Sequence, residues 1–183
     1  MSSFKKLSSE YISNHQYFTA RKDSYETNTG KIVSPYYVVE MPNCAVALAI
    51  TVDDKLVFIK QYRYPINKIC TELPGGFIEE KEPLENAMAR ELLEETGFQF
   101  ANFYYLGKSY SNPGVLTNCT HLFLCTGGTK VASQSLDANE EIEIILLSKE
   151  EVQQLLNDNK IQQSLHELCI IKGFEKLNSL EKV

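Results

Sequence analysis

The sequence predicts an α/β domain in which helices pack in layers against a mixed sheet. Short apolar runs bounded by turn residues indicate strands between residues 17 and 61, between residues 103 and 126, and again near residue 141. One amphipathic helix interrupts these strands, and two further helices are expected near the C-terminal end. Because strands and helices do not alternate regularly, we expect a mixed sheet.

The first elements along the chain are strands. Residues 17–42 contain a turn at residues 28–30, followed by the extended stretch Tyr36–Val39. The continuously apolar run Cys44–Val52 and the run Leu56–Gln61 flank an Asp-Asp-Lys turn, which predicts a central β-hairpin. Later strands are predicted at residues 103–110, 121–126 and 141–147. We therefore divide the chain into a small N-terminal β extension, residues 1–42, and a main domain, residues 43–183.

Three helices complete the expected fold. The clearest covers residues 83–96, because Pro83 suits its first position and Gly97 suits its C-terminal cap. A capping box that starts at Ser148 opens a second helix, and residues near 160–179 continue as a third.

Composition narrows the function. The chain has 183 residues, a net charge of -6 and no dense Lys/Arg cluster, so a nucleic-acid partner is disfavoured. Five irregularly spaced cysteines and only three histidines disfavour a zinc site and predict buried, reduced thiols in a cytoplasmic protein. No run approaches 18 apolar residues, and the N-terminus lacks the apolar region of an export signal. We expect neither membrane insertion nor export.

The helix at 83–96 carries carboxylates in an unusual phase. Acidic residues on a helix usually form a solvated face. At about 100° per residue, one apolar face is defined by Leu84, Ala87, Met88 and Leu92. Glu91 and Glu95 project into the middle of this face, and Glu94 lies at its edge. Carboxylates clustered beside a core are tolerable when a cation neutralises them, and their oxygen atoms suit Mg²⁺ or Mn²⁺.

Neighbouring residues fit such a site. Arg90 is placed to pair with Glu82 or Glu94 and to hold the cluster, or else to form an ordinary surface ion pair. The turn at residues 73–76 ends in two glycines, which allow close backbone approach and can offer a carbonyl oxygen to a metal. The same glycines could serve a tight turn alone.

The spacing of these residues resembles a known family. The pattern starts at Gly76, reaches Glu82 after five intervening residues and Arg90 after seven more, and ends at Phe98. It fills every fixed position of the Nudix box, GX5EX7REUXEEXGU. The resemblance implies an α/β/α sandwich around a mixed sheet. It implies Mg²⁺, or Mn²⁺ as a substitute, bound by Glu91, Glu94, Glu95 and the Gly75 carbonyl. Structural roles in the motif fall to Gly76, Glu82, Arg90 and Gly97.

Resemblance extends beyond the box to the ADP-ribose pyrophosphatases. Residues 61–65 and 72–76 are similar to the approach to the box in those enzymes, and a proline turn at 111–114 also matches. The substrate-binding residues implied are Arg63, Tyr36, Glu72, Pro113 and Gly114. Arg63 would contact the diphosphate. Tyr36 or Tyr37 would stack on the base, with core packing or a dimer contact as the alternative.

The expected reaction is hydrolysis of a nucleoside diphosphate sugar, with ADP-ribose, giving AMP and ribose 5-phosphate, as first candidate. The resemblance implies Glu94 and Glu140 as the catalytic carboxylates. For the base, Glu140 aligns best with the subfamily, and Asp137 and Glu141 are the alternatives. Many ADP-ribose enzymes carry a glutamate after the proline turn, but residues 115–118 here are Val-Leu-Thr-Asn. The alternative substrates are therefore GDP-mannose or another nucleotide sugar, a dinucleoside polyphosphate, and an RNA end. An alternative function is a sensor that binds ADP-ribose without cleaving it. By analogy with the subfamily we expect a homodimer formed through the N-terminal strands.

Overall fold

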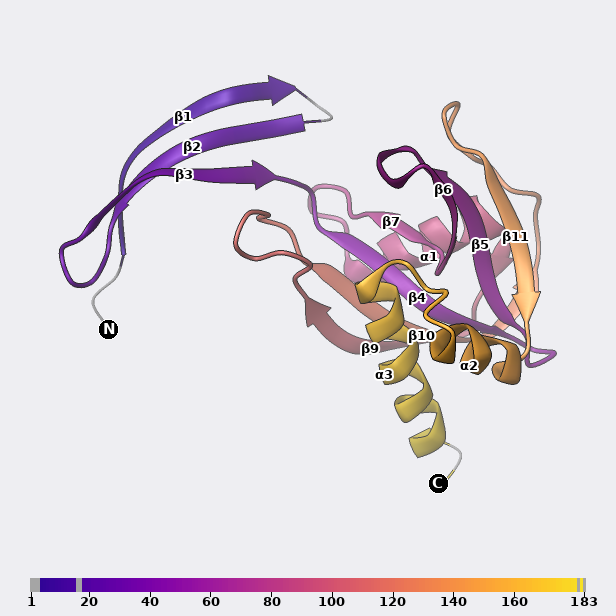
Figure 1. Ribbon diagram of the computed structural model, residues 1–183. Helices are drawn as coiled ribbons and strands as arrows, with labels where there is room; N and C mark the ends of the chain where they lie inside the picture. The colour runs from indigo at the N-terminus through magenta and orange to yellow at the C-terminus, as the bar shows by residue number, and fades with distance from the viewer. Residues whose placement is uncertain (1–3, 16–17, 181, 183) are drawn as a thin grey trace. The chain divides into compact units, whose positions relative to one another are not determined.

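The structure is a computed structural model that describes residues 4–15, 18–180 and 182, shown in Figure 1. Residue 17, where the predicted N-terminal strands begin, lies outside the described residues. The chain divides into two compact units. The N-terminal unit comprises Met1–Pro42 and Tyr110–Cys119, and the main unit comprises Asn43–Ser109 and Thr120–Val183. The segment Tyr110–Cys119, which the sequence assigned to the main domain, thus groups with the N-terminal residues.

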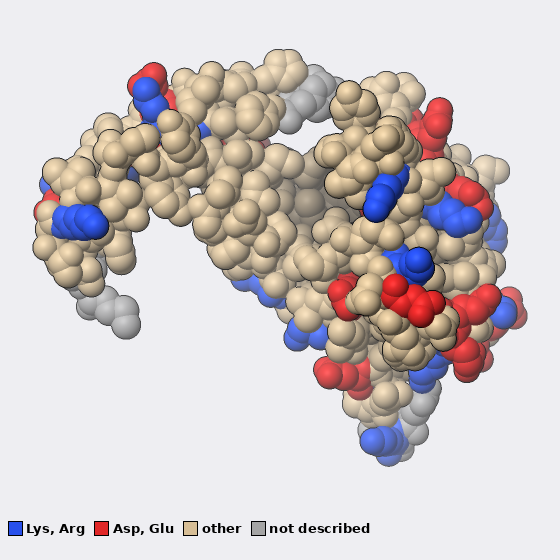
Figure 2. Space-filling view, in the orientation of Figure 1, with Lys and Arg blue, Asp and Glu red and all other residues tan. Residues whose placement is uncertain are grey.

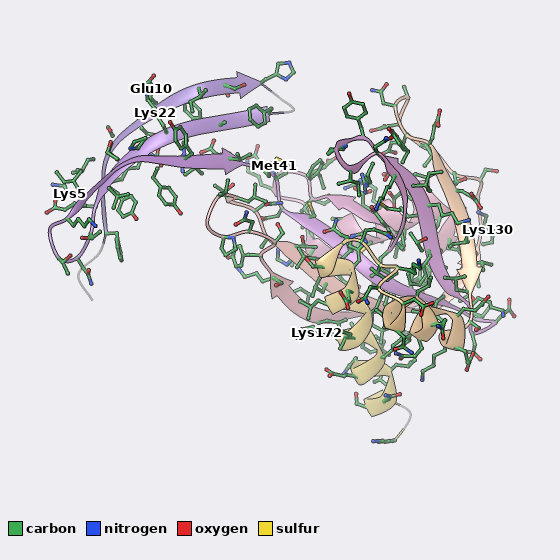
Figure 3. The ribbon with its side chains drawn as sticks, viewed as in Figure 1. Lys5, Glu10, Lys22, Met41, Lys130 and Lys172 are labelled. Carbon is green, nitrogen blue, oxygen red and sulfur yellow. The ribbon has the colours of Figure 1, made fainter. Side chains whose placement is uncertain are left out.

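The N-terminal unit is a three-stranded antiparallel sheet in the order β1-β2-β3. Its strands are β1 (Lys5–His15), β2 (Phe18–Glu26) and β3 (Ile32–Glu40). Glu10 and Lys22, labelled in Figure 3, form an ion pair of 3.0 Å between β1 and β2. The end of β3 is held by the segment Tyr110–Cys119, since the Val39 N–H donates to the Val115 carbonyl at 2.8 Å. Strand β1 was not predicted, because almost every side chain in it is exposed and none creates an apolar period.

The main unit contains an eight-stranded mixed sheet in the order β11-β5-β4-β10-β8, with β6 beside β5, β7 beside β4 and β9 beside β10. Its strands are β4 (Cys44–Thr51), β5 (Leu56–Arg63), β6 (Lys68–Glu72), β7 (Gly75–Phe77), β8 (Phe98–Gln99), β9 (Asn102–Ser109), β10 (Thr120–Lys130) and β11 (Ile142–Leu147). A short 3-10 helix, η1 (Tyr64–Ile66), joins β5 to β6. Strands β4 and β10 run parallel and the other pairs are antiparallel. The predicted mixed sheet is confirmed.

Helices cover both faces of this sheet, which Figure 1 shows most clearly around β4. They are α1 (Leu84–Thr96), α2 (Lys149–Asn157) and α3 (Ser164–Leu180). Successive side chains of a strand point to opposite faces, so Ala47 of β4 packs in one buried cluster with Met88 of α1. Its neighbour Leu48 packs in the other cluster, with Val152 of α2 and Ile170 of α3. The expected α/β/α sandwich is therefore confirmed. In the described part of the chain, no helix is long and apolar enough to cross a membrane.

Several boundaries differ from those predicted. Pro83 is the N-cap of α1 and has extended backbone angles, so it precedes the helix instead of opening it. Helix α3 begins at Ser164 rather than near residue 160, because Ile161 forms a β-bridge with Thr71. The predicted turn at residues 73–76 already contains the start of β7. A two-residue or three-residue strand has too little local pattern to be recognised, and only its pairing partner makes it a strand.

Candidate metal and substrate site

Arg90 organises the acidic side chains of α1 and of the loop before it. Its Nε and Nη2 donate to both oxygens of Glu82, at 3.0 Å each, and Nη2 also donates to the Phe77 carbonyl at 3.0 Å. Its Nη1 donates to Glu91 at 2.8 Å and to Glu94 at 3.0 Å. Arg90 thus pairs with both of its predicted partners. Hydrogen bonding to Glu82 raises the pKa of Arg90, and the same contact lowers the pKa of Glu82.

Glu95 lies deeper than the other acids of the helix. It is 6% exposed and accepts the Gly75 N–H at 2.8 Å. Burial raises its pKa to about 8, opposed by that hydrogen bond and reinforced by the negative charges of Glu91 and Glu140. Burial also raises the pKa of the half-buried Glu91. A Cβ at Gly76 would lie 2.6 Å from a Glu91 carboxylate oxygen, so a larger residue there would displace the Glu91 side chain.

These carboxylates face a cavity of about 570 Å³ in the main unit. Its walls include Glu91, Glu94 and Glu95 of α1, Arg63 at the end of β5, and Glu140 and Asp137 of the loop before β11. The fold thus gathers residues that are far apart in the chain. Glu141 is exposed and does not line the cavity, which favours the other two acids of its loop as a base. In Figure 2, acidic and basic side chains lie side by side over the visible face of the main unit.

The donor set fits a hard divalent cation by its chemistry. Among the described residues, no three His, Cys, Asp or Glu side chains are already arranged as a metal-binding group. Glu91 and Glu94 instead accept from Arg90, and Glu95 accepts from the Gly75 N–H. Burial raises the pKa values of Glu91 and Glu95, which disfavours their charged forms. A cation bound at the cavity would stabilise the charged forms of all three carboxylates. Carboxylate oxygens are the ligands that Mg²⁺ and Mn²⁺ prefer.

Arg63 and Glu72 form a bidentate ion pair within the main unit. The Arg63 Nε and Nη2 donate to the two Glu72 oxygens at 2.9 Å and 2.5 Å, and Glu72 is only 3% exposed. Hydrogen bonding to Glu72 raises the pKa of Arg63. A guanidinium carries five N–H donors, so this pair leaves donors of Arg63 available at the cavity wall. Glu72 therefore orients Arg63, while Arg63 stays the candidate for diphosphate contact.

The remaining predicted substrate residues belong to the N-terminal unit. The Tyr36 hydroxyl donates to the Gly114 carbonyl at 2.7 Å, so the structure brings these two residues together. Tyr36 also packs edge-on against Tyr25, with ring centroids 5.6 Å apart. Tyr37 is 58% exposed. Packing within its own unit thus accounts for Tyr36. Base stacking by Tyr36 or Tyr37 stays a prediction, as does substrate binding by Pro113 and Gly114.

A segment that sequence reasoning missed, residues 130–135, caps the C-terminal end of α1. The last carbonyl groups of a helix have no partner inside it. Here the Ser135 N–H donates to the Glu94 carbonyl at 2.8 Å, and the Lys130 ammonium donates to the Thr96 carbonyl at 2.6 Å. The Gln134 amide donates to the Glu95 carbonyl at 2.7 Å and to the carbonyl of Ile142 at 3.1 Å. Lys130, labelled in Figure 3, is the last residue of β10. This segment therefore connects the carboxylate helix to the loop that carries Glu140.

We expect Gln134→Met to lower the free energy of unfolding by about 1–3 kcal/mol, because two carbonyl groups lose their donor. Hydrogen exchange of residues 135–141 should become faster, because Gln134 joins the helix to the far end of this loop. Urea unfolding and mass-spectrometric exchange measure the two effects. Gln154→Met is the control, since Gln154 is exposed and, among the described residues, its side chain bonds only Asp158, the C-cap of α2. Equal stability and exchange in both variants would refute the role of Gln134.

His166 was also missed, because a single histidine on an apolar helix face gives no motif. It is 4% exposed, and its Nδ1 accepts the Leu73 N–H at 3.1 Å. Burial lowers the pKa of His166 to about 4, despite the nearby charge of Glu72. The ring is therefore neutral at pH 7 and lies in the wall of the cavity.

This histidine predicts acid destabilisation. The unfolded chain binds a proton near the ordinary pKa of 6.5, whereas the folded chain does so only near 4. Stability from the neutral ring is therefore complete above pH 6.5 and is lost as pH falls from 6.5 to 4. Between pH 7 and pH 5 the free energy of unfolding of the wild type should fall about 2 kcal/mol further than that of His166→Gln. Urea unfolding at both pH values measures this difference, and equal losses would contradict it.

Comparisons with known proteins identify the family of this chain. Residues 41–169 match the family described as NUDIX domain. The chain is 29% identical to the methanol dehydrogenase activator of Bacillus methanolicus, covering 87% of this chain and 86% of that protein. It is 27% identical to the ADP-ribose pyrophosphatase of Bacillus subtilis (strain 168), covering 86% and 88%. A crystal structure of an ADP compounds hydrolase shares the fold, with a TM-score of 0.86 at 20% identity, covering 100% of this chain and 98% of the other. The chain belongs to the Nudix family and is a pyrophosphohydrolase that resembles the ADP-ribose pyrophosphatases.

Proposed function

We propose that this protein hydrolyses the diphosphate of a nucleoside diphosphate sugar, and that ADP-ribose, cleaved to AMP and ribose 5-phosphate, is its substrate. One observation carries the proposal: the acidic face of α1, Arg63 and Glu140 line the same cavity. Cation ligands, a guanidinium for phosphoryl oxygens and a further carboxylate for a proton are the groups that diphosphate hydrolysis needs. Similarity to the ADP-ribose pyrophosphatase of Bacillus subtilis supports this choice of substrate.

Glu91, Glu94, Glu95 and the Gly75 carbonyl would hold Mg²⁺, with Mn²⁺ as a substitute. A cation bound there would neutralise charge on the diphosphate and lower the pKa of the attacking water. The chain's own residues do the rest. Arg90 orients Glu91 and Glu94, and the Gly75 N–H orients Glu95, so the three carboxylates stay directed by fixed donors.

Glu140 is proposed as the group that accepts the proton of the water. As the water oxygen bonds to one phosphorus, the bond from that phosphorus to the bridging oxygen breaks, and the other phosphate leaves with this oxygen. The Glu140 carboxylate accepts the Asp137 N–H at 3.2 Å, and the Glu140 N–H donates to the Asp137 carbonyl at 2.9 Å. A compact turn therefore holds the two acids of this loop that line the cavity.

Glu140→Gln is expected to lower kcat by about 10²–10⁴-fold, because a glutamine cannot accept the proton. Asp137→Asn should have a smaller effect, since the Asp137 backbone alone makes the contacts of the turn. Glu141→Gln serves as the control, because Glu141 is exposed and does not line the cavity. Steady-state kinetics of the three variants measures these effects. If Asp137→Asn lost more activity than Glu140→Gln, the base would be Asp137.

The substrate is tested by product release. The purified protein is incubated with Mg²⁺ and ADP-ribose, GDP-mannose, a dinucleoside polyphosphate or capped RNA, and the nucleotide products are separated by chromatography. We expect AMP from ADP-ribose at a higher kcat/KM than any product from the other compounds. Faster release of nucleotide from GDP-mannose would make that sugar nucleotide the proposed substrate. Binding of ADP-ribose without release of AMP would indicate that the protein is a sensor and not a hydrolase of this compound.

We also propose a homodimer formed through the N-terminal sheet. This sheet and the residue before it expose apolar side chains that a monomer leaves in water, among them Phe4, Ile12, Phe18 and Ile32, each more than half exposed. A second copy of the chain would cover them. Light scattering during gel filtration should give twice the mass of 20.8 kDa, and the monomer mass would exclude the dimer.

A further inference from the structure

The N-terminal end of α3 lies at the cavity of the main unit. Gln163, Leu165 and His166 all line this cavity. The Gln163 carbonyl accepts the N–H groups of His166 and Glu167 at 3.0 Å and 3.1 Å, so the N–H groups ahead of His166 have no acceptor inside the helix. Helix α3 has 17 residues, and the N-terminal end of such a helix carries partial positive charge. This part of the wall therefore attracts acceptor atoms and anions.

His166 adds a hydrogen-bond donor, its Nε2–H group. Because Nδ1 accepts the Leu73 N–H, Nδ1 carries no proton, and in the neutral ring the proton lies on Nε2. Among the described residues, no acceptor bonds this Nε2–H. In the described part of the chain this nitrogen is not among the buried polar atoms that lack a partner, and His166 is one of the residues that line the cavity. The cavity can supply the missing acceptor in a bound ligand.

We propose that His166 Nε2–H and the N-terminal end of α3 form a donor subsite for a phosphoryl oxygen of the substrate. The cavity would then have two kinds of wall, with carboxylates on α1 for a cation and neutral donors on α3 for phosphoryl oxygens. Glu72 is close enough to His166 to influence its pKa, but its charge is balanced by the bidentate pair with Arg63. This subsite rests on the proposed function, because it assigns part of the same cavity to the phosphate of the sugar moiety.

A binding experiment tests the subsite without turnover. Long-range ¹H–¹⁵N spectra of the wild type in EDTA report which ring nitrogen of His166 carries the proton. We expect the proton on Nε2, and we expect ribose 5-phosphate to shift this nitrogen while ribose does not. A proton on Nδ1, or no shift at saturating ribose 5-phosphate, would overturn the subsite. An equal shift with ribose would also overturn it, because the ligand atom would then be a hydroxyl.

Two substitutions separate the two nitrogens of the ring. His166→Asn can still accept the Leu73 N–H near the place of Nδ1 but has no donor near that of Nε2. His166→Gln reaches the place of Nε2 with an amide donor. We expect the asparagine variant to raise KM at least tenfold with kcat changed less than threefold, and the glutamine variant to recover most of the loss. Circular dichroism and thermal unfolding verify that each variant is folded.

The outcomes distinguish this subsite from the proposed function. If the wild type cleaves none of the test compounds, the proposed function fails, while the ribose 5-phosphate titration still decides the subsite. If a folded asparagine variant keeps the wild-type KM, the subsite is wrong although the hydrolase activity stands. If the asparagine variant does not fold, the titration of the wild type decides.

Discussion

Glu95→Gln is expected to lower kcat by about 10³-fold while leaving the fold intact. A metal ion stabilises the transition state by several kcal/mol, and each 1.4 kcal/mol is a factor of ten. Glutamine lacks the negative charge that a cation needs, yet its amide oxygen can still accept the Gly75 N–H that Glu95 accepts at 2.8 Å. The substitution therefore separates the charge of Glu95 from its structural hydrogen bond.

The measurement is ADP-ribose turnover as a function of Mg²⁺ concentration, together with thermal unfolding. Glu85→Gln is the matched control, since Glu85 lies on the same helix but is exposed and does not line the cavity. We expect Glu94→Gln to behave like Glu95→Gln. If both variants turned over ADP-ribose at the wild-type rate at ordinary Mg²⁺ concentrations, the assignment of these carboxylates as metal ligands would be wrong.

Arg90→Met should lower the free energy of unfolding by about 3 kcal/mol. Removing one partner of a buried ion pair leaves the other charges uncompensated and costs about 3–5 kcal/mol. The Arg90 side chain is 28% exposed, so solvent screens part of this effect and the low end of the range applies. Its loss leaves Glu82, Glu91 and Glu94 close together without their shared cation.

Urea unfolding of Arg90→Met measures this loss, and Lys81→Met is the control. Lys81 is 89% exposed and, within the described part of the chain, pairs only with Glu80, so its removal should change the unfolding free energy by less than about 0.5 kcal/mol. Adding Glu82→Gln to Arg90→Met should recover part of the stability, because one uncompensated charge disappears. A double variant that is less stable than the sum of the single effects predicts would contradict the charge explanation.

The sequence alone predicted those elements whose pattern is local. Helix α1 follows from apolar spacing and from Gly97, which has a φ of 66° and donates its N–H to the Leu93 carbonyl as a C-cap. The capping box at Ser148 is present with both of its hydrogen bonds. The inward position of Glu95 also follows from helical phase, and the residue is indeed buried. Each of these features depends on residues only a few positions apart.

Other features depend on residues that are far apart in the chain. Strand β7 exists because Gly75 and Gly76 pair with Val46 and Ala45, some thirty residues earlier. The cap formed by Gln134 reaches Glu95 across 39 positions. His166 bonds Leu73 across 93 positions. No periodicity or short motif contains such contacts, so they could not be predicted from the pattern.

By itself, the sequence determined the pattern of carboxylates on α1, because helical phase and the spacing from Gly76 to Phe98 are encoded within 23 residues. Only the tertiary structure decided which other groups meet that helix. It placed Glu140 and His166 at the same cavity, and it paired Arg63 with Glu72. The physical reason is that a cavity wall is assembled by packing between layers of the sandwich, and packing brings together side chains that share no local pattern.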